Sequence, residues 1–296
     1  MPNVELVTAG VDWLSMTLTD EALQYGEWRN ICNQQLYEIA NEGYVIEERA
    51  MLGYIGFGCA NSFVGTLNDR TLVQFSGQHA DAAYYKTYRE DAHYSRIDLQ
   101  VTVKFDVSHD TLGKEAEDAA NSHNTNVHKG RPRRIEHYAG NDGGFTLYIG
   151  SPSSEVRCRL YNKEKQSQDT QFERSWRYEV VYRNEMCDKW RTSVYNAGYE
   201  ARDVILSIVS DHYRERGVDV RYLGDYPLPA ARPIKRSISD DERKLKWLET
   251  QVVPTIDYLV NRGYEYDLRE LFHRITNDSH YPSCPLVIEL AQFVDA

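Results

Sequence analysis

The sequence predicts an α+β fold: an antiparallel sheet with helices packed against it, followed by a helical C-terminal part. Three observations support this prediction. Several segments alternate apolar and polar residues at the period of a strand, most regularly over 96–106. Gly- and Asn-containing breaks separate shorter strand-like segments, as in hairpins. From residue 186 onward, helical periodicity replaces the alternation.

The N-terminal half contains a strand, a helix and hairpins before its most regular strand. Residues 11–19 (VDWLSMTLT) alternate as a strand, and residues 21–43 follow the helical period. Short strand-like pieces occupy 53–78. Residues 96–106 (RIDLQVTVKFD) place apolar side chains on one face and polar side chains on the other, and a helical stretch follows near 113–123.

The second half continues with strands and ends in helices. Residues 145–165 predict a hairpin that turns at 150–154, and residues 174–185 predict a third alternating strand. A helix is expected over 200–217 and another over 243–263, bent near Pro254.

A Pro-rich stretch marks the expected domain boundary. We expect an α+β domain over 1–225, a linker over 226–238 and a helical segment over 239–296. Ser239 and Glu242 have the spacing of a capping box at the start of that segment.

The composition is that of a globular chain, with 296 residues of which 41% are hydrophobic and 27% charged. Its apolar runs are far shorter than a membrane span and no basic and apolar leader opens it, so we expect a cytoplasmic protein without a membrane partner. The five cysteines are scattered and form no C-x-x-C pair. This pattern favours a reducing compartment and argues against a zinc site.

Charge is unevenly distributed along the chain. The formal net charge of −11 argues against a nucleic-acid partner, because phosphate binding needs a basic surface. Basic residues nevertheless gather in the middle of the sequence, which is compatible with a basic groove on an acidic body. They are Lys129, Arg131, Arg133 and Arg134 in the run KGRPRR, then Arg157, Arg159, Lys163 and Lys165, then Arg174, Arg177 and Arg183.

Three predicted strands each carry a reactive polar side chain on the face opposite their apolar residues: Asp98, Tyr161 and Glu179. If these strands are neighbours, the three side chains converge. Two carboxylates offer oxygen ligands to Mg²⁺ or Mn²⁺, and such a cation polarises a phosphoryl oxygen. Tyrosine is a nucleophile once deprotonated, and we expect nearby Arg and Lys charges to favour the phenolate and to hold DNA phosphates. This chemistry suits exchange of one phosphodiester for another.

The same residues also have a plain structural interpretation. A tyrosine in a strand usually packs, and the chain contains 22 tyrosines. Arg and Lys on an outer strand face are normally solvated, and an alternating acid is usually a surface residue or the partner of a cation such as Arg96 or Arg177. The run KGRPRR by itself is typical of a solvated loop. The residue chemistry alone leaves both interpretations open.

Three segments resemble, in order and spacing, signature segments of Rep_trans-type replication initiation factors, the rolling-circle initiators of plasmids, integrative elements and some phages. They are RIDLQV, TLYIGSPSSEVRCRLYNKEKQ and WRYEVVY. VDWLSMTLT, LVQFSGQHA and LKWLETQVVPTIDYL extend the resemblance over most of the chain. The run from YIGS to RLYNK is its most specific part.

The resemblance implies a divergent HUH-endonuclease-like sheet and a metal-dependent DNA nicking and closing enzyme. Tyr161 would be the nucleophile, ending as a 5′-phosphotyrosine and freeing a 3′-hydroxyl primer. Asp98 and Glu179 would hold Mg²⁺ or Mn²⁺, with Arg159 and Lys163 assisting catalysis. The implied partners are origin DNA, with a single-stranded or cruciform nick site and flanking duplex, a host helicase and polymerase, and a second copy in a homodimer. The expected DNA contacts are Lys129, Arg131, Arg133, Arg134, Arg157 and Arg177.

One position departs from the family pattern. The family strand often reads R-x-D-x-x-x-D, and the residue four positions after Asp98 is Thr102. The second acid is therefore either dispensable or replaced by another carboxylate, such as Asp106 or Glu136.

Other functions remain open at this point. A conjugative relaxase of an integrative element would use the same chemistry, and the sequence does not separate the two. A catalytically inactive homologue would only bind the origin, as a repressor or copy-control factor. An α+β protein that does not bind DNA is favoured only by the net charge.

Overall fold

The structure is a computed structural model that describes residues 3–127, 132–141, 143–167, 169–198, 201–218, 244, 247–248 and 252–277. The chain divides into two compact units, Met1–Pro233 and Ile234–Ala296. The expected linker over 226–238 and the expected capping pair lie outside the described residues. No helix that the structure describes is both long and apolar enough to cross a membrane.

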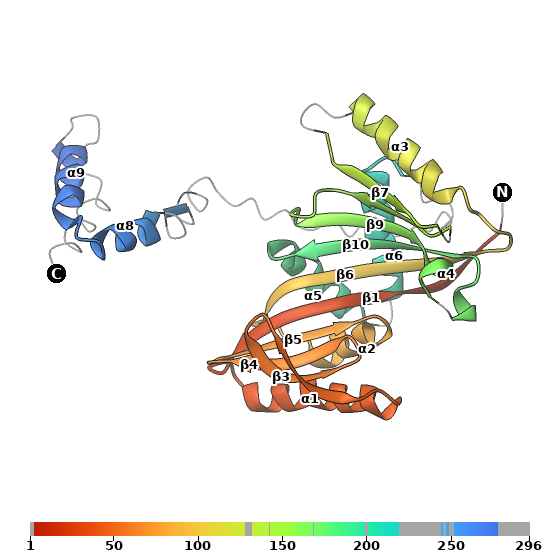
Figure 1. Ribbon diagram of the computed structural model, residues 1–296, viewed down its shortest axis with the longest axis horizontal. Helices are drawn as coiled ribbons and strands as arrows, with labels where there is room; N and C mark the ends of the chain where they lie inside the picture. The colour runs from red at the N-terminus through yellow and green to blue at the C-terminus, as the bar shows by residue number, and fades with distance from the viewer. Residues whose placement is uncertain are drawn as a thin grey trace. The chain divides into compact units, whose positions relative to one another are not determined.

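In the first unit, ten described strands form one continuous antiparallel sheet (Figure 1). Their order across the sheet is β2-β3-β4-β5-β1-β6-β10-β9-β8-β7. The antiparallel sheet predicted from the sequence is therefore confirmed. The strands are β1 (Val4–Thr19), β2 (Ile46–Met51), β3 (Tyr54–Cys59), β4 (Ser62–Leu67), β5 (Arg70–Ser76), β6 (His93–Phe105), β7 (Ile135–Ala139), β8 (Phe145–Ile149), β9 (Val156–Asn162) and β10 (Ser175–Arg183).

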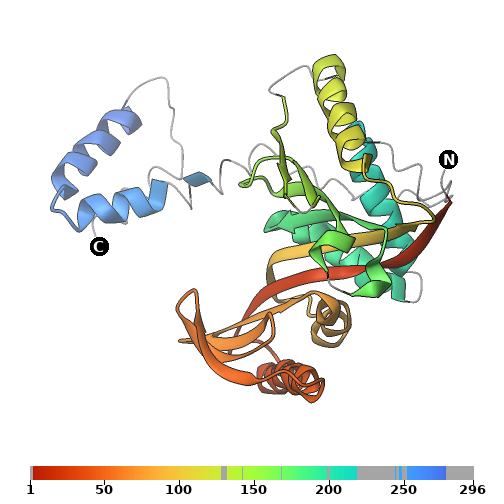
Figure 2. The same cartoon turned by 45° about the vertical axis from the view of Figure 1, so that its right-hand side comes forward.

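Five helices pack against one face of this sheet, and their apolar side chains form a single hydrophobic core with the strands. Burial of this apolar surface is the main force that holds the unit together. Figures 1 and 2 show α5 and α6 behind the central strands. The helices are α1 (Tyr25–Asn41), α2 (Gln78–Thr87), α3 (Leu112–Val127), α5 (Glu185–Ala197) and α6 (Ala201–Arg214).

On the opposite face, the structure describes two short elements of the first unit. A one-turn helix, α4 (Lys163–Gln166), and a 3₁₀ turn, η1 (Thr170–Phe172), connect β9 to β10. Phe172 of η1 approaches the polar face, since the centre of its ring lies 5.7 Å from the guanidinium carbon of Arg177. The helices therefore leave one face of the sheet to polar groups.

The three strands expected to carry reactive residues are adjacent. β6 pairs with β10, and β10 pairs with β9. On its other side β6 pairs with β1. The adjacency assumed from the sequence is thereby confirmed, and β1 joins the group.

The sheet is larger than the sequence pattern predicts. β2, β7 and the helix α2 have no counterpart among the expected elements. β2 (IEERAM) and β7 (IEHYA) lie at the two edges of the sheet, where several side chains face water. Edge strands lose the clean alternation of apolar and polar residues, because they are not covered as a central strand is.

The second unit contains α8 (Val253–Val260) and α9 (Glu265–Asn277) among its described residues. The sequence predicts a helix over 243–263 that bends near Pro254. The described residues before α8, 244, 247–248 and 252, are also helical, and α8 begins at Val253 with Pro254 in its first turn. This placement is favourable because the missing N–H of a proline has no helical partner at that position.

Replacing Gly10 of β1 with alanine should destabilise the first unit. An added Cβ would lie 2.6 Å from Oδ1 of Asp81 in α2. That same oxygen accepts a hydrogen bond from the Val11 N–H at 2.7 Å. We expect Gly10→Ala to lower the free energy of unfolding by about 1–3 kcal/mol, measured by urea denaturation of the full chain.

Gly26→Ala in α1 is the matched control, because nothing lies within 4 Å of its added Cβ. This change should leave stability unchanged or raise it by up to about 1 kcal/mol, since alanine favours helix. Equal unfolding midpoints for the two variants would contradict the close approach of Asp81 to β1.

Candidate active site

The candidate active site lies on the polar face of the sheet. Two rows of facing residues cross β10, β9, β8 and β7. Side chains that face each other on adjacent strands lie on the same face, with Cβ atoms about 4.5–5.5 Å apart. The first row is Arg177, Tyr161, Thr146 and Tyr138, and the second is Glu179, Arg159, Tyr148 and Glu136.

Three carboxylates near the centre of this face each pair with an arginine. Asp98 on β6 and Glu179 on β10 are only 1% and 0% exposed. A buried charge is costly unless it is paired and hydrogen-bonded, so these arginines are needed wherever the acids are ionised. The pairs are Asp98 with Arg96, Glu179 with Arg159, and Asp12 with Arg177.

Asp12 reaches this face because β1 is irregular there. Under strict alternation Asp12 would share the core face with Leu14. The pairing of β1 with β6 shifts register between Val11 and Trp13, which is a β-bulge that redirects the intervening side chain. Asp12 then accepts a hydrogen bond from Nη1 of Arg177 at 2.7 Å. Sequence reasoning missed Asp12, because the bulge leaves no clear signal in the residue pattern.

Tyr161 is held by one of these carboxylates. Its side chain is 4% exposed, and its hydroxyl donates a hydrogen bond to Oε1 of Glu179 at 2.6 Å. Burial raises the pKa of Tyr161 well above its usual range and the charge of Glu179 raises it further, while Arg177 and Arg159 act in the opposite direction. The two arginines therefore favour the phenolate, as expected from the sequence, but burial and the charge of Glu179 outweigh their effect on the pKa of Tyr161.

Glu179 is the group positioned to receive that proton. Burial raises the pKa of Glu179 to about 7, against the lowering effect of Arg159. Asp12 and Asp98 raise it further, because like charges disfavour ionisation. A carboxylate with a pKa near neutral pH is suited to act as a general base. Burial also raises the pKa of Asp98, opposed by its hydrogen bonds from Arg96.

Lys163 and Arg177 contribute cations on either side of Tyr161. The Nζ atom of Lys163 lies 5.9 Å from the centre of the Tyr161 ring and bonds to Gln166 at 2.8 Å. Burial lowers the pKa of Lys163, and the neighbouring charge of Arg177 adds to this effect. Arg177 is itself only 6% exposed, so its guanidinium is enclosed by protein.

Arg157 and Arg134 lie toward the edge of the sheet, away from Tyr161. The Arg157 guanidinium carbon is 3.9 Å from the centre of the Tyr148 ring, and its Nη2 bonds to Glu136 at 3.1 Å. Arg134 bonds to the other oxygen of Glu136. These two expected DNA contacts therefore share one carboxylate on β7.

Arg133, from the same basic run, bonds away from Tyr161. Arg133 donates a hydrogen bond to the backbone carbonyl of Glu215, just after the end of α6, at 3.2 Å. Burial lowers the pKa of Arg133. Lys129 and Arg131 lie outside the described residues.

Thr102 occupies the position where the family pattern often has a second acid. Its hydroxyl accepts a hydrogen bond from Nε of Arg177 at 2.8 Å. Of the carboxylates proposed to replace that acid, Glu136 lies on the edge strand and Asp106 follows the end of β6. Asp12 is the carboxylate that bonds to the same guanidinium as Thr102.

The carboxylates have the oxygen chemistry that Mg²⁺ and Mn²⁺ prefer. Arginines bond to oxygens of Asp98, Glu179 and Asp12 in this arrangement. Within the described ranges, no group of three or more His, Cys, Asp or Glu side chains is placed to hold a metal. The types of donor atom therefore fit a hard divalent cation. In this arrangement, the carboxylate oxygens bond to arginines instead of a cation.

Glu179 should make stability depend on pH. Its folded-state pKa of about 7 lies above the ordinary value of 4.5, so the folded protein binds this proton more tightly than the unfolded chain. The resulting stability is fully present below about pH 4.5 and is lost as the pH rises to about 7. Its size is on the order of 3 kcal/mol.

Urea denaturation in EDTA across this pH range tests the effect. Glu179→Gln removes the titrating group, so between the two pH limits this variant should lose about 3 kcal/mol less stability than the wild type. Identical pH profiles for the two proteins would show that Glu179 titrates normally.

Comparison with known proteins places the chain in a family. The sequence profile Rep_trans, described as replication initiation factor, matches residues 95–275. A rolling-circle replication initiator protein from Geobacillus stearothermophilus has a similar structure, with a TM-score of 0.50 and 18% identity over 72% of this chain and 85% of that chain. At this identity the likeness concerns the fold. No curated protein matches the chain. Because the profile covers more than half of the sequence, the resemblance is confirmed and this protein belongs to the replication initiation factor family.

Proposed function

We propose that this initiation factor nicks one DNA strand at a replication origin, with Tyr161 as the nucleophile, and so starts rolling-circle replication. The observation that carries the proposal is the hydrogen bond from the Tyr161 hydroxyl to Glu179 at 2.6 Å. It joins a nucleophile to a base on the face of the sheet opposite the five described long helices of the first unit. Nucleophile and base within hydrogen-bond reach are the signature of covalent catalysis.

The proposed step conserves atoms and charge. The phenolic oxygen of Tyr161 bonds to phosphorus as its proton passes to Oε1 of Glu179. The bond from phosphorus to the 3′ oxygen breaks, and that oxygen takes a proton from solvent to become a 3′-hydroxyl. The 5′ side stays attached as a phosphotyrosine. The free 3′-hydroxyl primes synthesis, and the reverse reaction closes the strand.

Arg159 is the guanidinium best placed to stabilise the phosphoryl group. Its side chain is 26% exposed, whereas that of Arg177 is 7% exposed. An open guanidinium next to the nucleophile is able to bind phosphate oxygens as charge develops on them. Arg177, bonded to Asp12 and Thr102, instead orients the strands around Tyr161.

We further propose that Asp98 and Glu179, with Asp12 beside them, hold Mg²⁺ or Mn²⁺ during the reaction. The support is the oxygen donor set on three adjacent strands. When bound, such a cation polarises a phosphoryl oxygen. Arginines would then release carboxylate oxygens and become available to DNA.

Origin DNA is the proposed substrate, with a host helicase, a host polymerase and a second copy of this chain as further proposed partners. A conjugative relaxase would use the same site, and no observation favours it. A homologue that only binds DNA would not need Tyr161 bonded to a carboxylate.

Tyr161→Phe should abolish nicking. The assay uses supercoiled plasmid carrying the native origin, with Mg²⁺ or Mn²⁺, and detects nicked circles with protein on the 5′ end. The phenylalanine lacks the attacking oxygen, so the rate should fall by roughly 10³-fold or more.

Tyr182→Phe is the control, because Tyr182 lies in the core and its hydroxyl has no hydrogen-bond partner among the described residues. This variant should nick as the wild type does. Undiminished nicking by Tyr161→Phe would show that another residue is the nucleophile.

EDTA should stop nicking by the wild type, and Mg²⁺ or Mn²⁺ should restore it. Asp98→Asn should raise the cation concentration required by about 10- to 100-fold or more, because it removes one of the proposed ligand charges. A gel shift of origin DNA, which needs no strand cleavage, reports whether the variant is folded. Wild-type nicking that persists in EDTA would refute the metal requirement.

A further inference from the structure

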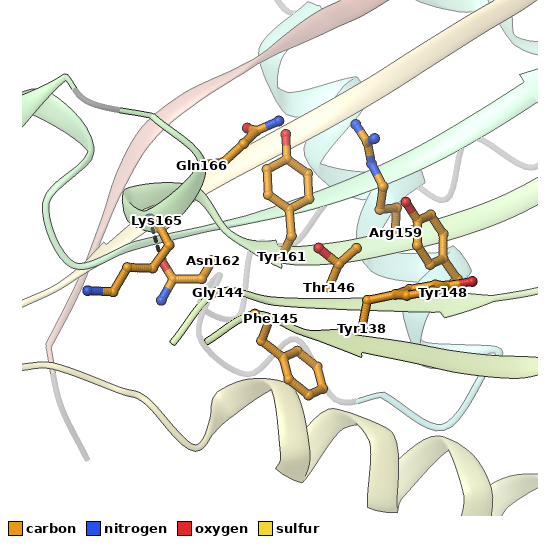
Figure 3. Close-up of a pocket in the computed structure, with 11 residues that line it drawn as sticks. Tyr138, Gly144, Phe145, Thr146, Tyr148, Arg159, Tyr161, Asn162, Lys165 and Gln166 are labelled. Atoms are coloured by element: carbon orange, nitrogen blue, oxygen red, sulfur yellow. Dashed lines mark hydrogen bonds between the residues drawn. The ribbon is translucent and has the colours of Figure 1, made fainter. Parts of the chain in front are cut away.

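A pocket of about 360 Å³ adjoins Tyr161 on the polar face. Its floor follows the first row of facing residues, in which Thr146 lies between Tyr161 and Tyr138. Figure 3 shows side chains from the neighbouring strands around this hollow, with Gln166 and Lys165 on the side of α4. The pocket therefore lies directly beside the proposed nucleophile.

Small residues create the space. Thr146 is short, and Gly140 and Gly144 line the pocket without side chains. Tyr161 and Tyr138 are each one strand away from Thr146, so their backbones are separated by roughly 10 Å. The volume lies within the usual range for ligand sites of about 300–1,000 Å³.

The lining combines aromatic rings with cations and amides. Tyr138 is 61% exposed although it is a large aromatic residue. Its ring meets Tyr148 edge to face, with centroids 5.8 Å apart and planes at 84°. Arg159 and Lys165 bring positive charge, and Asn162 and Gln166 bring amide groups.

Tyr148 is fixed by its surroundings. The guanidinium of Arg157 stacks over its ring, and Glu136 bonds to Arg157 in turn. Tyr148, held in this way, packs against Tyr138, whose ring stays largely exposed. An exposed, supported aromatic ring beside cations is the arrangement by which proteins stack a nucleobase and bind its phosphate.

We propose that this pocket binds one unpaired nucleobase of single-stranded DNA, next to the phosphate that Tyr161 attacks. The base stacks on Tyr138, and Arg159 and Lys165 contact the flanking phosphates. The inference rests on the proposed nicking function and adds a subsite to it. The base must be unpaired, because a base within a duplex is stacked between its neighbours and cannot enter a pocket.

The test measures binding and needs no catalysis. Fluorescence anisotropy follows binding of labelled dT12 and of a matched 12-mer of abasic sites, in EDTA, to the full chain. Tyr138→Ala should weaken dT12 binding by about 5- to 100-fold, the range expected for loss of one base–aromatic stack. It should leave binding of the abasic 12-mer unchanged, because the phosphates remain.

Two variants make the result specific. Tyr138→Phe keeps the ring and should bind dT12 as the wild type does. Tyr37→Ala removes an equally exposed tyrosine on α1, where Tyr37 is 63% exposed, and should have no effect.

The pocket is refuted if Tyr138→Ala binds dT12 as tightly as the wild type, or if the wild type binds dT12 no better than the abasic 12-mer. Failure of the proposed nicking function would give a different set of results. In that case the wild type does not nick origin plasmid, while the difference between Tyr138→Ala and Tyr138→Phe on dT12 persists.

Discussion

Glu179 brings a carboxylate into the polar face of the sheet, where none of its side chain is exposed to water. An ionised acid in such a place must be compensated, because burial of an unpaired charge is very costly. Arg159 and Tyr161, both on β9, supply the hydrogen bonds. The need to compensate Glu179 therefore positions both Arg159 and Tyr161, the nucleophile proposed for strand cleavage. The arginines of β9 thus bond to acids, Arg159 to Glu179 and Arg157 to Glu136.

The placement of the helices makes this site possible. The five long helices described in the first unit contribute to one core on one face of the sheet. The other face keeps its polar residues, with α4 and η1 beside Tyr161. β1 connects the two faces of the sheet through neighbouring residues. Asp81 of α2 bonds to Val11 at the bulge, and the next residue, Asp12, reaches the polar face to hold Arg177.

Much of the central sheet was predictable, because alternation of apolar and polar residues is strong where one face packs against helices. β6, β9 and β10 were expected, and so were the faces of Asp98, Tyr161 and Glu179. The edge strands β2 and β7 were missed because edge positions lose that alternation. Asp12 was missed because a bulge reverses the face that alternation assigns to it. The sequence identified cations that favour the phenolate of Tyr161, but it did not show the burial that outweighs their effect on its pKa.

Local periodicity in the sequence was enough to assign the face that each residue of a regular strand occupies, and the sequence also carried the family signature. Three features came from the tertiary structure: β1 lies beside β6, each acid has its own arginine, and burial beside Glu179 raises the pKa of Tyr161. These features depend on the register between strands distant in sequence and on the exclusion of water. Neither is encoded in the pattern of one strand alone.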